Sequence, residues 1–543
     1  MKKSKWKRYV DRIYKQMEEF LQKICEILGW LEDQRYAAVR DSSDDIKNLY
    51  EKMDDKTQDA SLKLLINNME LDKPENMLFL SYLFKAVRSE KMQYMIERIL
   101  LEENFPVLDD IVALYQLTAY IFNNPVSQSR DSWISHFKLQ TAIHLKQVEK
   151  ILRLLNMELP YVPFEQRKKK RVLLLCKVFM HEYHAPTAKI INISYWLQSL
   201  GYETYICCTY MGELEREREL QWFDINEENC VCQETGHYVV NYFGKENRLY
   251  NINYTTANYK EETKKAVLWI RDYNPAFILD VGGENVFAGV CNQFTTVCTM
   301  GCVNKPVLSA ANIYVRYFEC TDDEEKYYEE GMRDNQKLFQ MRHMDELYAN
   351  NEKNISREEY GIKKNEFVIL IAGNRLDTEV SPKFQNILTK ILQEQRNTSI
   401  VFIGNCEKLE KRLRDDPFAE RYHFLGLVLN FKEIMSIGDL FLNPPRQGGG
   451  TGAYYAIENE VPVLTLPHCD VAQVGEQFVC ETMDEMPQIV ARYIHDPAYM
   501  NQMKKICREN IKTLVYDVDN IQNIKKFCED IEVYIKEQEQ KNM

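Results

Sequence analysis

A glycine-rich segment in the last quarter of the chain carries the residues best suited to hold an anion. Gly448, Gly449 and Gly450 follow a short apolar run and precede Thr451 and Gly452. Glycine lacks a Cβ, so the backbone there can approach a ligand closely or adopt a positive φ. Thr451 is a good N-cap for the helical pattern that follows, and the free N–H groups and dipole of a helix N-terminus attract phosphate. The segment predicts a phosphate site, and close packing of a strand on a helix is the alternative.

This glycine segment belongs to the second of two stretches in which buried-strand and helical patterns alternate. The expected strands are at 172–176, 203–209, 276–280 and 295–299, and then at 367–372, 399–403, 423–427, 439–442 and 461–466. Strands that alternate with helices predict parallel, doubly wound sheets, whose ligands bind beyond the carboxyl ends of the strands. We therefore expect two Rossmann-like α/β domains that face a cleft, over residues 166–345 and 346–520. A C-terminal helix is expected over 521–543.

Residues 1–165 form a separate composition block, with few glycines and with apolar residues at helical spacing. Leu62, Leu65, Ile66 and Met69 show the i, i+3, i+4, i+7 pattern of an amphipathic helix. We expect an all-α N-terminal domain, and a degenerate array of helical hairpins stays open.

Composition and charge exclude several classes of protein. The 543 residues carry a formal net charge of −13, which argues against a protein that binds nucleic acid by neutralising phosphates. No stretch approaches the ~18 consecutive apolar residues of a membrane helix, and no apolar core of a signal peptide follows the basic N-terminus. The basic run at 166–171 adjoins an apolar strand, so we interpret it as a linker rather than as a nucleic-acid patch.

The cysteines indicate the redox compartment. The chain has 15 of them, without a paired C-x2-C spacing, and its 9 histidines are scattered. Cys176, Cys207 and Cys208 stand in apolar runs, where cysteine behaves as a small hydrophobe. This usage predicts a reduced, cytoplasmic protein without structural zinc.

The order of turns in the second stretch resembles the donor half of a GT-B glycosyltransferase. It runs from Gly373-Asn374-Arg375 through Ile403-Gly404-Asn405 and Phe424-Leu425-Gly426 to the glycine segment and Val461-Pro462-Val463. The chain is most similar to the O-GlcNAc-transferase-like family and its bacterial relatives that glycosylate proteins in the cytoplasm, which also place a helical region ahead of the GT-B pair. The resemblance implies an α/β GT-B fold preceded by an all-α domain, with a nucleotide-sugar as donor.

The resemblance also implies a set of donor-binding residues. They are Arg375, Lys383, Gly449, Gly450, Thr451, Gly452 and Asp470, with His468 and Asp470 beside the donor sugar. Thr451 matches the hydroxyl that meets the diphosphate, and Arg375 and Lys383 lie where such enzymes place a cation. An exposed first-turn position is the alternative for Lys383. The acid that commonly binds ribose is replaced by Tyr455, and Glu458 is the substitute one helical turn on.

The other half would then bind the acceptor. Many retaining GT-B enzymes have two glutamates at positions that match Gln447 and Tyr455, so the absence of both favours inversion by direct displacement. The base of such a displacement lies on the acceptor side, where His184 follows the first strand and is the candidate catalytic residue. His181 is its rival, and a structural role in the loop is the alternative for both histidines.

Two acids lie at another strand end of the acceptor half. Asp280 and Glu284 flank Gly282-Gly283, and they either contact the acceptor or cap the next helix. No metal or other cofactor is expected, because a helix dipole and cations can stabilise the departing diphosphate. The glycine segment also lacks the carboxylates that Mg²⁺ needs as ligands beside the phosphates.

The sequence thus predicts a glycosyltransferase that moves a hexosyl or N-acetylhexosaminyl group from a UDP-sugar to a protein or glycan acceptor, with inversion. Residues 1–165 are expected to recognise the acceptor or a protein partner, so that their removal leaves donor binding unchanged. One alternative is a catalytically degenerate GT-B protein that binds a nucleotide-sugar or stabilises a partner. Another is a retaining hexosyltransferase of cell-envelope glycans. The sequence assigns neither the sugar nor the oligomeric state.

Overall fold

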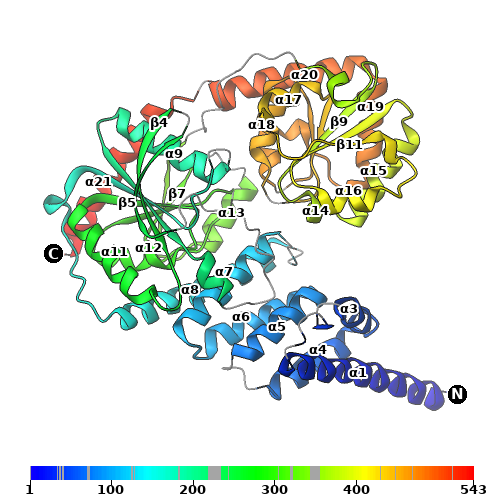
Figure 1. Cartoon of the computed structure of the whole chain (residues 1–543), viewed down its shortest axis with the longest axis horizontal. Coiled ribbons are helices and arrows are strands. Elements are labelled where there is room, and N and C mark those ends of the chain that lie inside the picture. Colours follow the sequence, from blue (N-terminus) through cyan, green and yellow to red (C-terminus); the bar gives the residue numbers. More distant parts are fainter. Residues whose placement is uncertain are drawn as a thin grey trace.

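The computed structural model describes the chain except residues 1, 34, 36–37, 40–41, 70–73, 124–125, 127–128, 182–183, 218–233, 243, 304, 318–321, 343–354, 429, 447, 468, 517 and 543. Figure 1 shows a helical region in blue and two α/β halves, one mainly green and one yellow to orange. This succession of a helical region and two Rossmann-like halves is the one expected from the sequence.

The regular secondary structure described for the N-terminal region is helical. Its helices are α1 (Lys2–Glu32), α3 (Ser43–Glu51), α4 (Asp55–Asn67), α5 (Pro74–Val87), α6 (Glu90–Glu102), α7 (Val107–Asn123) and α8 (Arg130–Leu155). Leu62 and Leu65, predicted to face the core of this region, are buried in it. Helix α8 begins after Ser129, whose side chain accepts a hydrogen bond from Ser132 N–H, and ends at Asn156 in the left-handed conformation. None of the helices among the described residues combines the length and apolarity of a membrane span.

The first sheet orders its strands β3-β4-β2-β1-β5-β6-β7-β8. These strands are β1 (Lys168–Cys176), β2 (Glu203–Tyr210), β3 (Gly236–Tyr242), β4 (Lys245–Asn253), β5 (Pro275–Val281), β6 (Val297–Met300), β7 (Ile313–Arg316) and β8 (Lys337–Gln340). All neighbours pair in parallel except β3 and β4, which form an antiparallel hairpin at the edge. The sequence did not predict this hairpin, because polar residues interrupt both strands and neither shows a continuous apolar run.

Helices cover both faces of the first sheet. They are α9 (Ala185–Ser199), α10 (Gly212–Arg216), α11 (Tyr259–Tyr273), α12 (Val286–Cys291) and α13 (Asp322–Gly331). The C-terminal helix α21 (Asn520–Asn542) packs beside α9 on this same sheet, as the red helix in the green half of Figure 1 shows. Ile524, Phe527 and Ile531 of α21 are buried there, in one core with Val172 and Leu174 of β1.

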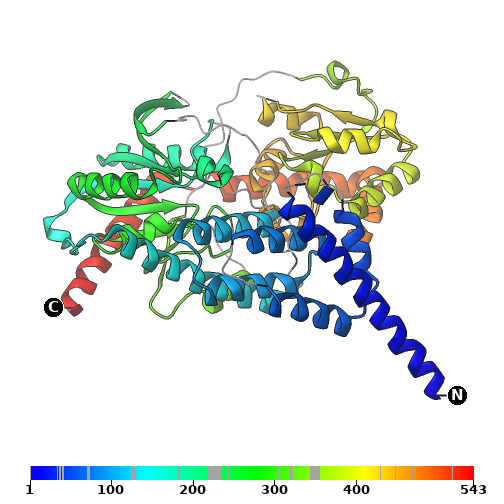
Figure 2. The same cartoon turned by 60° about the horizontal axis from the view of Figure 1, so that its bottom comes forward.

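The helical region shares a core with the first half. Val148, Ile151 and Leu155 of α8 are buried against Leu173 of β1 and Phe287 of α12. Figure 2 shows the cyan helix running beneath the green half along much of its length. The helical region is therefore one wall of the first half as well as a bundle with its own core.

The second sheet is parallel, in the order β11-β10-β9-β12-β13. Its strands are β9 (Phe367–Ala372), β10 (Thr398–Ile403), β11 (Tyr422–Phe424), β12 (Leu440–Leu442) and β13 (Val463–Leu464). Its helices are α14 (Leu376–Glu379), α15 (Pro382–Glu394), α16 (Glu407–Leu413), α17 (Phe431–Ile434), α18 (Gly450–Glu458), α19 (Met486–His495) and α20 (Pro497–Ile511). Because β9, β12 and β13 are neighbours, the loops after their carboxyl ends lie side by side.

Candidate active site

The glycine segment joins β12 to α18 through two residues in the left-handed region. Gly448 has a φ of +83° and Gly449 a φ of +90°. A Cβ on Gly449 would lie 2.6 Å from Nη2 of Arg446, so the backbone there tolerates no side chain. The N-cap of α18 is Gly449, and the expectation that Thr451 caps the helix is wrong: Thr451 is exposed within its first turn. A glycine cap supplies no side-chain acceptor, which leaves the first N–H groups of α18 for a ligand.

A buried carboxylate holds two arginines next to this turn. Glu379 accepts a hydrogen bond from Nη1 of Arg446 at 2.7 Å and from Nε of Arg375 at 3.1 Å. Arg446 also donates to the carbonyl of Ala372 and to Oδ1 of Asn443, both at 2.7 Å, so its guanidinium is fully engaged. Arg375 is more exposed, with 35% of its side chain accessible. Arg446 thus joins the loops after β9 and β12 through hydrogen bonds, and Arg375 is the arginine that a ligand can reach.

Arg375 reaches the glycine turn, as the sequence predicted. Its Nη2 lies 3.7 Å from the position that a Cβ on Gly448 would occupy. Its guanidinium carbon also lies 5.3 Å from the ring centre of Phe122, which belongs to α7. The helical region therefore contacts the second half at the candidate donor site.

Asp470 lies on the other side of the turn, at the start of a short 3-10 helix (Asp470–Val474) that follows β13. Its Cβ is 3.4 Å, and its Oδ2 4.0 Å, from the positions that a Cβ would occupy on Gly450 and Gly448, respectively. Asp470 is thus in contact with the glycine turn. Its relative solvent accessibility is 8%. The structure brings together Arg375, the glycine turn and Asp470.

Other residues predicted for the donor side lie elsewhere. Lys383 is exposed in the first turn of α15, and no described residue pairs with it. Gly452 is buried toward the rings of Phe441 and Phe431, so it can offer a ligand only its backbone. Glu458 forms an ion pair of 2.8 Å with Lys432 at the far end of α18.

Of Tyr455 and Gln447, the two positions at which many retaining GT-B enzymes have glutamates, the structure describes Tyr455. Tyr455 is 1% exposed and packs edge-on against Phe431, so its hydroxyl-bearing ring belongs to the core. Gln447 and His468 lie outside the residues that the structure describes. Among the described residues, no group of three His, Cys, Asp or Glu side chains is arranged to hold a metal ion. Independence from metal remains a prediction.

On the acceptor side, His184 precedes α9 and is held by the first turn of that helix. Its Nδ1 lies 2.9 Å from Oγ1 of Thr187, which also accepts a hydrogen bond from Met180 N–H at 3.0 Å. Burial lowers the pKa of His184 to about 4, with a further contribution from the nearby His181. The ring centres of the exposed His181 and of His184 are 6.4 Å apart. His184 is therefore neutral at physiological pH, with its Nε2 not used by Thr187.

The two acids of the acceptor half differ from each other. Asp280 is 1% exposed and accepts a hydrogen bond from Thr299 at 3.3 Å, and burial raises its pKa to about 7. It lies in the interior of the sheet, out of reach of an acceptor at the surface. Glu284 forms an ion pair of 2.8 Å with Lys177, just after β1, and accepts from Thr118 of α7 at 3.4 Å. Neither acid is the N-cap of α12, a role that Asn285 fills.

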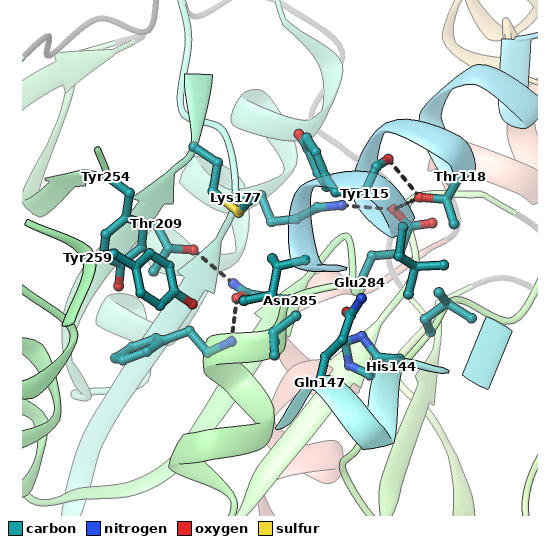
Figure 3. Close-up of a pocket in the computed structure, with 16 residues that line it drawn as sticks. Tyr115, Thr118, His144, Gln147, Lys177, Thr209, Tyr254, Tyr259, Glu284 and Asn285 are labelled. Atoms are coloured by element: carbon teal, nitrogen blue, oxygen red, sulfur yellow. Dashed lines mark hydrogen bonds and ion pairs between the residues drawn. The ribbon is translucent and has the colours of Figure 1, made fainter. Parts of the chain in front are cut away.

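Glu284 lines a small pocket between the helical region and the first sheet (Figure 3). Lys177 and Thr209 come from the carboxyl ends of β1 and β2, and Tyr115 and His144 come from α7 and α8. The cavity volume is ≈ 20 Å³, about the room of one water molecule. Nε2 of His144 is buried and has no hydrogen-bond partner in the described part of the chain, and burial lowers the pKa of His144 to about 3. The pocket is thus lined by a neutral imidazole and an internally paired Lys177 and Glu284.

Several residues of the site were not found from the sequence. Glu379 lies four residues after Arg375, a spacing at which ion pairs form, and could have been noticed. Arg446 stands directly before the glycine turn and Lys177 directly after a predicted strand, so both had a positional signal. Phe122 had none, because its partner lies in another part of the chain.

No family model and no curated protein matches the sequence. Among solved structures, the chain is similar to a mutant of the O-GlcNAc transferase of Thermobaculum terrenum, with 14% identity over 97% of this chain and 99% of that one and a TM-score of 0.48. It is also similar to HepE of Anabaena in complex with UDP and glucose, with 13% identity over 66% of this chain and 99% of that one and a TM-score of 0.46. A third is WaaG, a glycosyltransferase involved in lipopolysaccharide biosynthesis, with 13% identity, the same coverages and a TM-score of 0.40.

The chain has a GT-B fold. Two parallel Rossmann-like sheets follow one another after the helical region, and the last helix returns to the first sheet. The fold class expected from the sequence is confirmed.

Proposed function

We propose that this protein transfers a sugar from a nucleotide-sugar, most suitably a UDP-sugar, to a protein or glycan acceptor, with inversion and without a metal ion. The observation that carries the proposal is the approach of Arg375 to the glycine turn at the N-terminus of α18. A diphosphate at this position would accept backbone hydrogen bonds and meet both the helix dipole and a guanidinium.

The donor side is preorganised for a departing diphosphate. Glu379 and Phe122 hold the guanidinium of Arg375 on two sides, so little side-chain freedom remains to be lost when an anion binds. Fixed donors and dipoles that face developing negative charge lower the barrier without reorganising during the reaction. They would stabilise the diphosphate as its bond to the anomeric carbon breaks.

On the acceptor side, His184 would take the proton of the attacking hydroxyl. For this role its Nδ1–H must donate to Oγ1 of Thr187, since only that tautomer leaves a lone pair on Nε2. The hydroxyl oxygen then bonds to the anomeric carbon while the diphosphate leaves from the opposite face, which inverts the configuration. A base with a pKa of about 4 is weak, so departure of the diphosphate would run ahead of proton transfer.

The acceptor would approach along α7. Tyr115 and Thr118 of this helix lie at the pocket on the first sheet, and Phe122 lies at Arg375 of the second half. The spacing of these three residues puts them on one face of the helix, about 10 Å from end to end. That face connects the carboxyl end of the first sheet with the proposed donor site.

The proposal is tested by incubating the protein with UDP-glucose, UDP-N-acetylglucosamine, UDP-galactose and their GDP counterparts. Release of the nucleoside diphosphate is measured in excess EDTA, and the anomer of the released or transferred sugar is read by NMR. Turnover in EDTA with an inverted anomer supports the proposal. Activity that EDTA abolishes contradicts metal independence, and a retained anomer favours a retaining hexosyltransferase.

A second candidate is a GT-B protein that binds a nucleotide-sugar without transferring it. The burial of Tyr455 and the pairing of Glu458 with Lys432 favour it, because neither position then offers an acid to the ribose. Nucleotide binding by calorimetry, together with the absence of turnover for every donor and for free water as acceptor, would support this candidate.

A further inference from the structure

Helix α1 changes its surroundings along its length. Its second half packs in the helical region, where Phe20, Ile24 and Ile27 are buried in the core. Among the described side chains of α1 that precede Phe20, none is buried, and Tyr14 is 64% exposed. Figure 2 shows the first half of the dark blue helix running out beyond the other helices. The bundle is therefore built on the second half of α1.

The apolar stripe of α1 nevertheless continues into its first half. Trp6, Val10, Ile13 and Met17 follow one another at spacings of four, three and four residues within this helix. Such spacing places these positions on one face. The series leads to Phe20, the first residue of the helix that is buried in the bundle. A helix that keeps an apolar face beyond the core on which it packs has a further surface to cover.

Basic residues border this stripe. Six of the first twelve residues are Lys or Arg and one, Asp11, is acidic, so this segment carries a formal charge of +5 while the whole chain carries −13. At about 100° per residue, Lys3 and Lys7 fall on one side of the stripe. Lys5 and Arg12 fall on the other. An apolar face between two rows of positive charge, on an otherwise acidic protein, is complementary to an anionic surface with an apolar interior.

An anionic lipid bilayer fits this description better than the other candidates do. Its acyl chains cover an apolar face, its headgroups attract lysines, and tryptophan is favoured at its interface. Nucleic acid pairs with the charges and leaves the apolar stripe uncovered. A second α1 aligned in parallel would place equal charges side by side. An antiparallel one would need an apolar second half that the bundle already buries.

We propose that residues 2–17 of α1 lie in the interface of an anionic lipid bilayer, with the apolar stripe toward the acyl chains and the basic residues at the headgroups. This inference goes beyond the proposed function and does not rest on it. It assigns the basic start of the chain, to which the proposed function gives no role, to attachment at a membrane surface.

The test is flotation of the full chain with vesicles of phosphatidylcholine, made with and without about 30 mol% phosphatidylglycerol. The wild type should float with the anionic vesicles and stay unbound with phosphatidylcholine alone. Each basic residue near an anionic surface strengthens binding roughly fivefold, so replacing four of them by glutamine should weaken partition at least about a hundredfold. The four are Lys3, Lys5, Lys7 and Arg8. The matched control replaces four exposed lysines of the second half and of α21 by glutamine and should bind as the wild type does; they are Lys408, Lys411, Lys525 and Lys526.

Two further measurements separate insertion of the helix from attraction of charge alone. The emission of Trp6, taken as the difference between the wild type and Trp6→Phe, should shift to shorter wavelength with anionic vesicles, because the indole leaves water. Val10→Asn keeps every charge and removes an apolar group, so it should weaken partition about tenfold. Circular dichroism checks that each variant keeps the fold. The lipid and salt dependence of the wild type tests the inference without any variant, since binding should be lost at about 1 M salt.

Several results would overturn the inference. They are equal binding to both kinds of vesicle, equal binding of wild type and the fourfold α1 variant, and a Trp6 emission that vesicles leave unchanged. Binding of single-stranded RNA without binding of vesicles would assign the basic segment to nucleic acid instead. A dimer that Val10→Asn dissociates, without binding of vesicles, would assign the stripe to a second copy of the chain. Each of these results leaves the proposed function intact, because donor turnover is measured separately.

Discussion

The guanidinium carbon of Arg375 lies 5.3 Å from the ring centre of Phe122, although one residue follows a strand of the second sheet and the other ends a helix of the N-terminal region. The helical region therefore reaches the site where a donor would bind. The expectation that this region leaves donor binding unchanged remains a prediction, and this contact and the core shared with the first half argue against it.

Replacing Phe122 by leucine should weaken binding of a nucleoside diphosphate by about two- to fivefold, the value of a cation–π contact at a partly exposed site. Leucine keeps apolar packing and removes the ring face that orients Arg375. Tyr14→Leu, at a 64% exposed aromatic of α1, is the matched control. Calorimetric titration of both variants checks this, and an unchanged Kd for Phe122→Leu would mean that the contact does not orient Arg375 for binding.

Thr451→Val should reduce affinity for the diphosphate by about 1.5–3 kcal/mol, since the hydroxyl that would meet a charged phosphate is lost and the shape is kept. Thr451→Ser retains the hydroxyl and is expected to bind nearly as the wild type does. Thr451 is exposed, so neither change should affect the fold. If valine and serine variants bind equally well, the phosphate does not contact this hydroxyl.

Glu379→Gln should lower the free energy of unfolding by about 3–5 kcal/mol, because it leaves the buried Arg446 without its counter-ion. The side chains of Glu379 and Arg446 are 5% and 4% accessible, respectively. Glu394→Gln, at an exposed position on α15, provides the control. The measurement is urea denaturation followed by circular dichroism, and a loss below about 1 kcal/mol would show that water or another residue compensates Arg446.

Deleting residues 1–165 should yield an insoluble or unfolded protein, in place of the independent GT-B pair expected from the sequence. The deletion removes Val148, Ile151 and Leu155, whose side chains share a core with Leu173 and Phe287 of the first half. Each buried aliphatic side chain contributes roughly 1.5–3 kcal/mol. Deleting residues 1–105 spares α7 and α8 and is the comparison. Expression, followed by size-exclusion chromatography and nucleotide binding, distinguishes the two, and a soluble protein without residues 1–165 that binds donor would contradict this expectation.

The pH dependence of turnover should report the depressed pKa of His184. Its neutral form is required for the reaction and persists until the pH falls to about 4, so kcat/KM should show no loss near pH 6.5. The unfolded chain binds a proton already near pH 6.5, so this histidine also lowers the stability of the fold as the pH falls from 6.5 toward 4.

Thr187→Val should shift the pH profile of kcat/KM, because it removes the hydroxyl that fixes the tautomer of His184. Thr255→Val is the control. An acidic limb centred near 6.5 that disappears in His184→Gln would show that His184 is more exposed in the active form.

The sequence predicted those parts of the fold whose causes are local. Buried strands such as β9 and β10 are continuous apolar runs, and the glycine turn has a composition that few other structures require. The arrangement of Arg375 beside Gly448 followed from the rule that loops after neighbouring parallel strands meet at one edge.

The remaining parts depend on contacts between distant segments. Nothing near Phe122 in the sequence indicates that its ring meets Arg375. The capping role given to Thr451 was wrong because a glycine in the left-handed conformation precedes the helix, and a threonine preference could not reveal that φ. Asp280 follows a strand as a ligand-binding acid would, but its neighbours bury it.

Helix α21 also has a consequence for the order in which the protein is completed during translation. Phe527 packs edge-on against Phe277 of β5, and Glu539 accepts a hydrogen bond from the backbone N–H of Phe164, so the first half needs residues made after the whole second half. On the ribosome, the second sheet can therefore assemble while the apolar face of the first is still uncovered. That nascent intermediate is the species most in need of a chaperone. A stop codon just before Asn520 would spare the second half and leave the first with an open hydrophobic face.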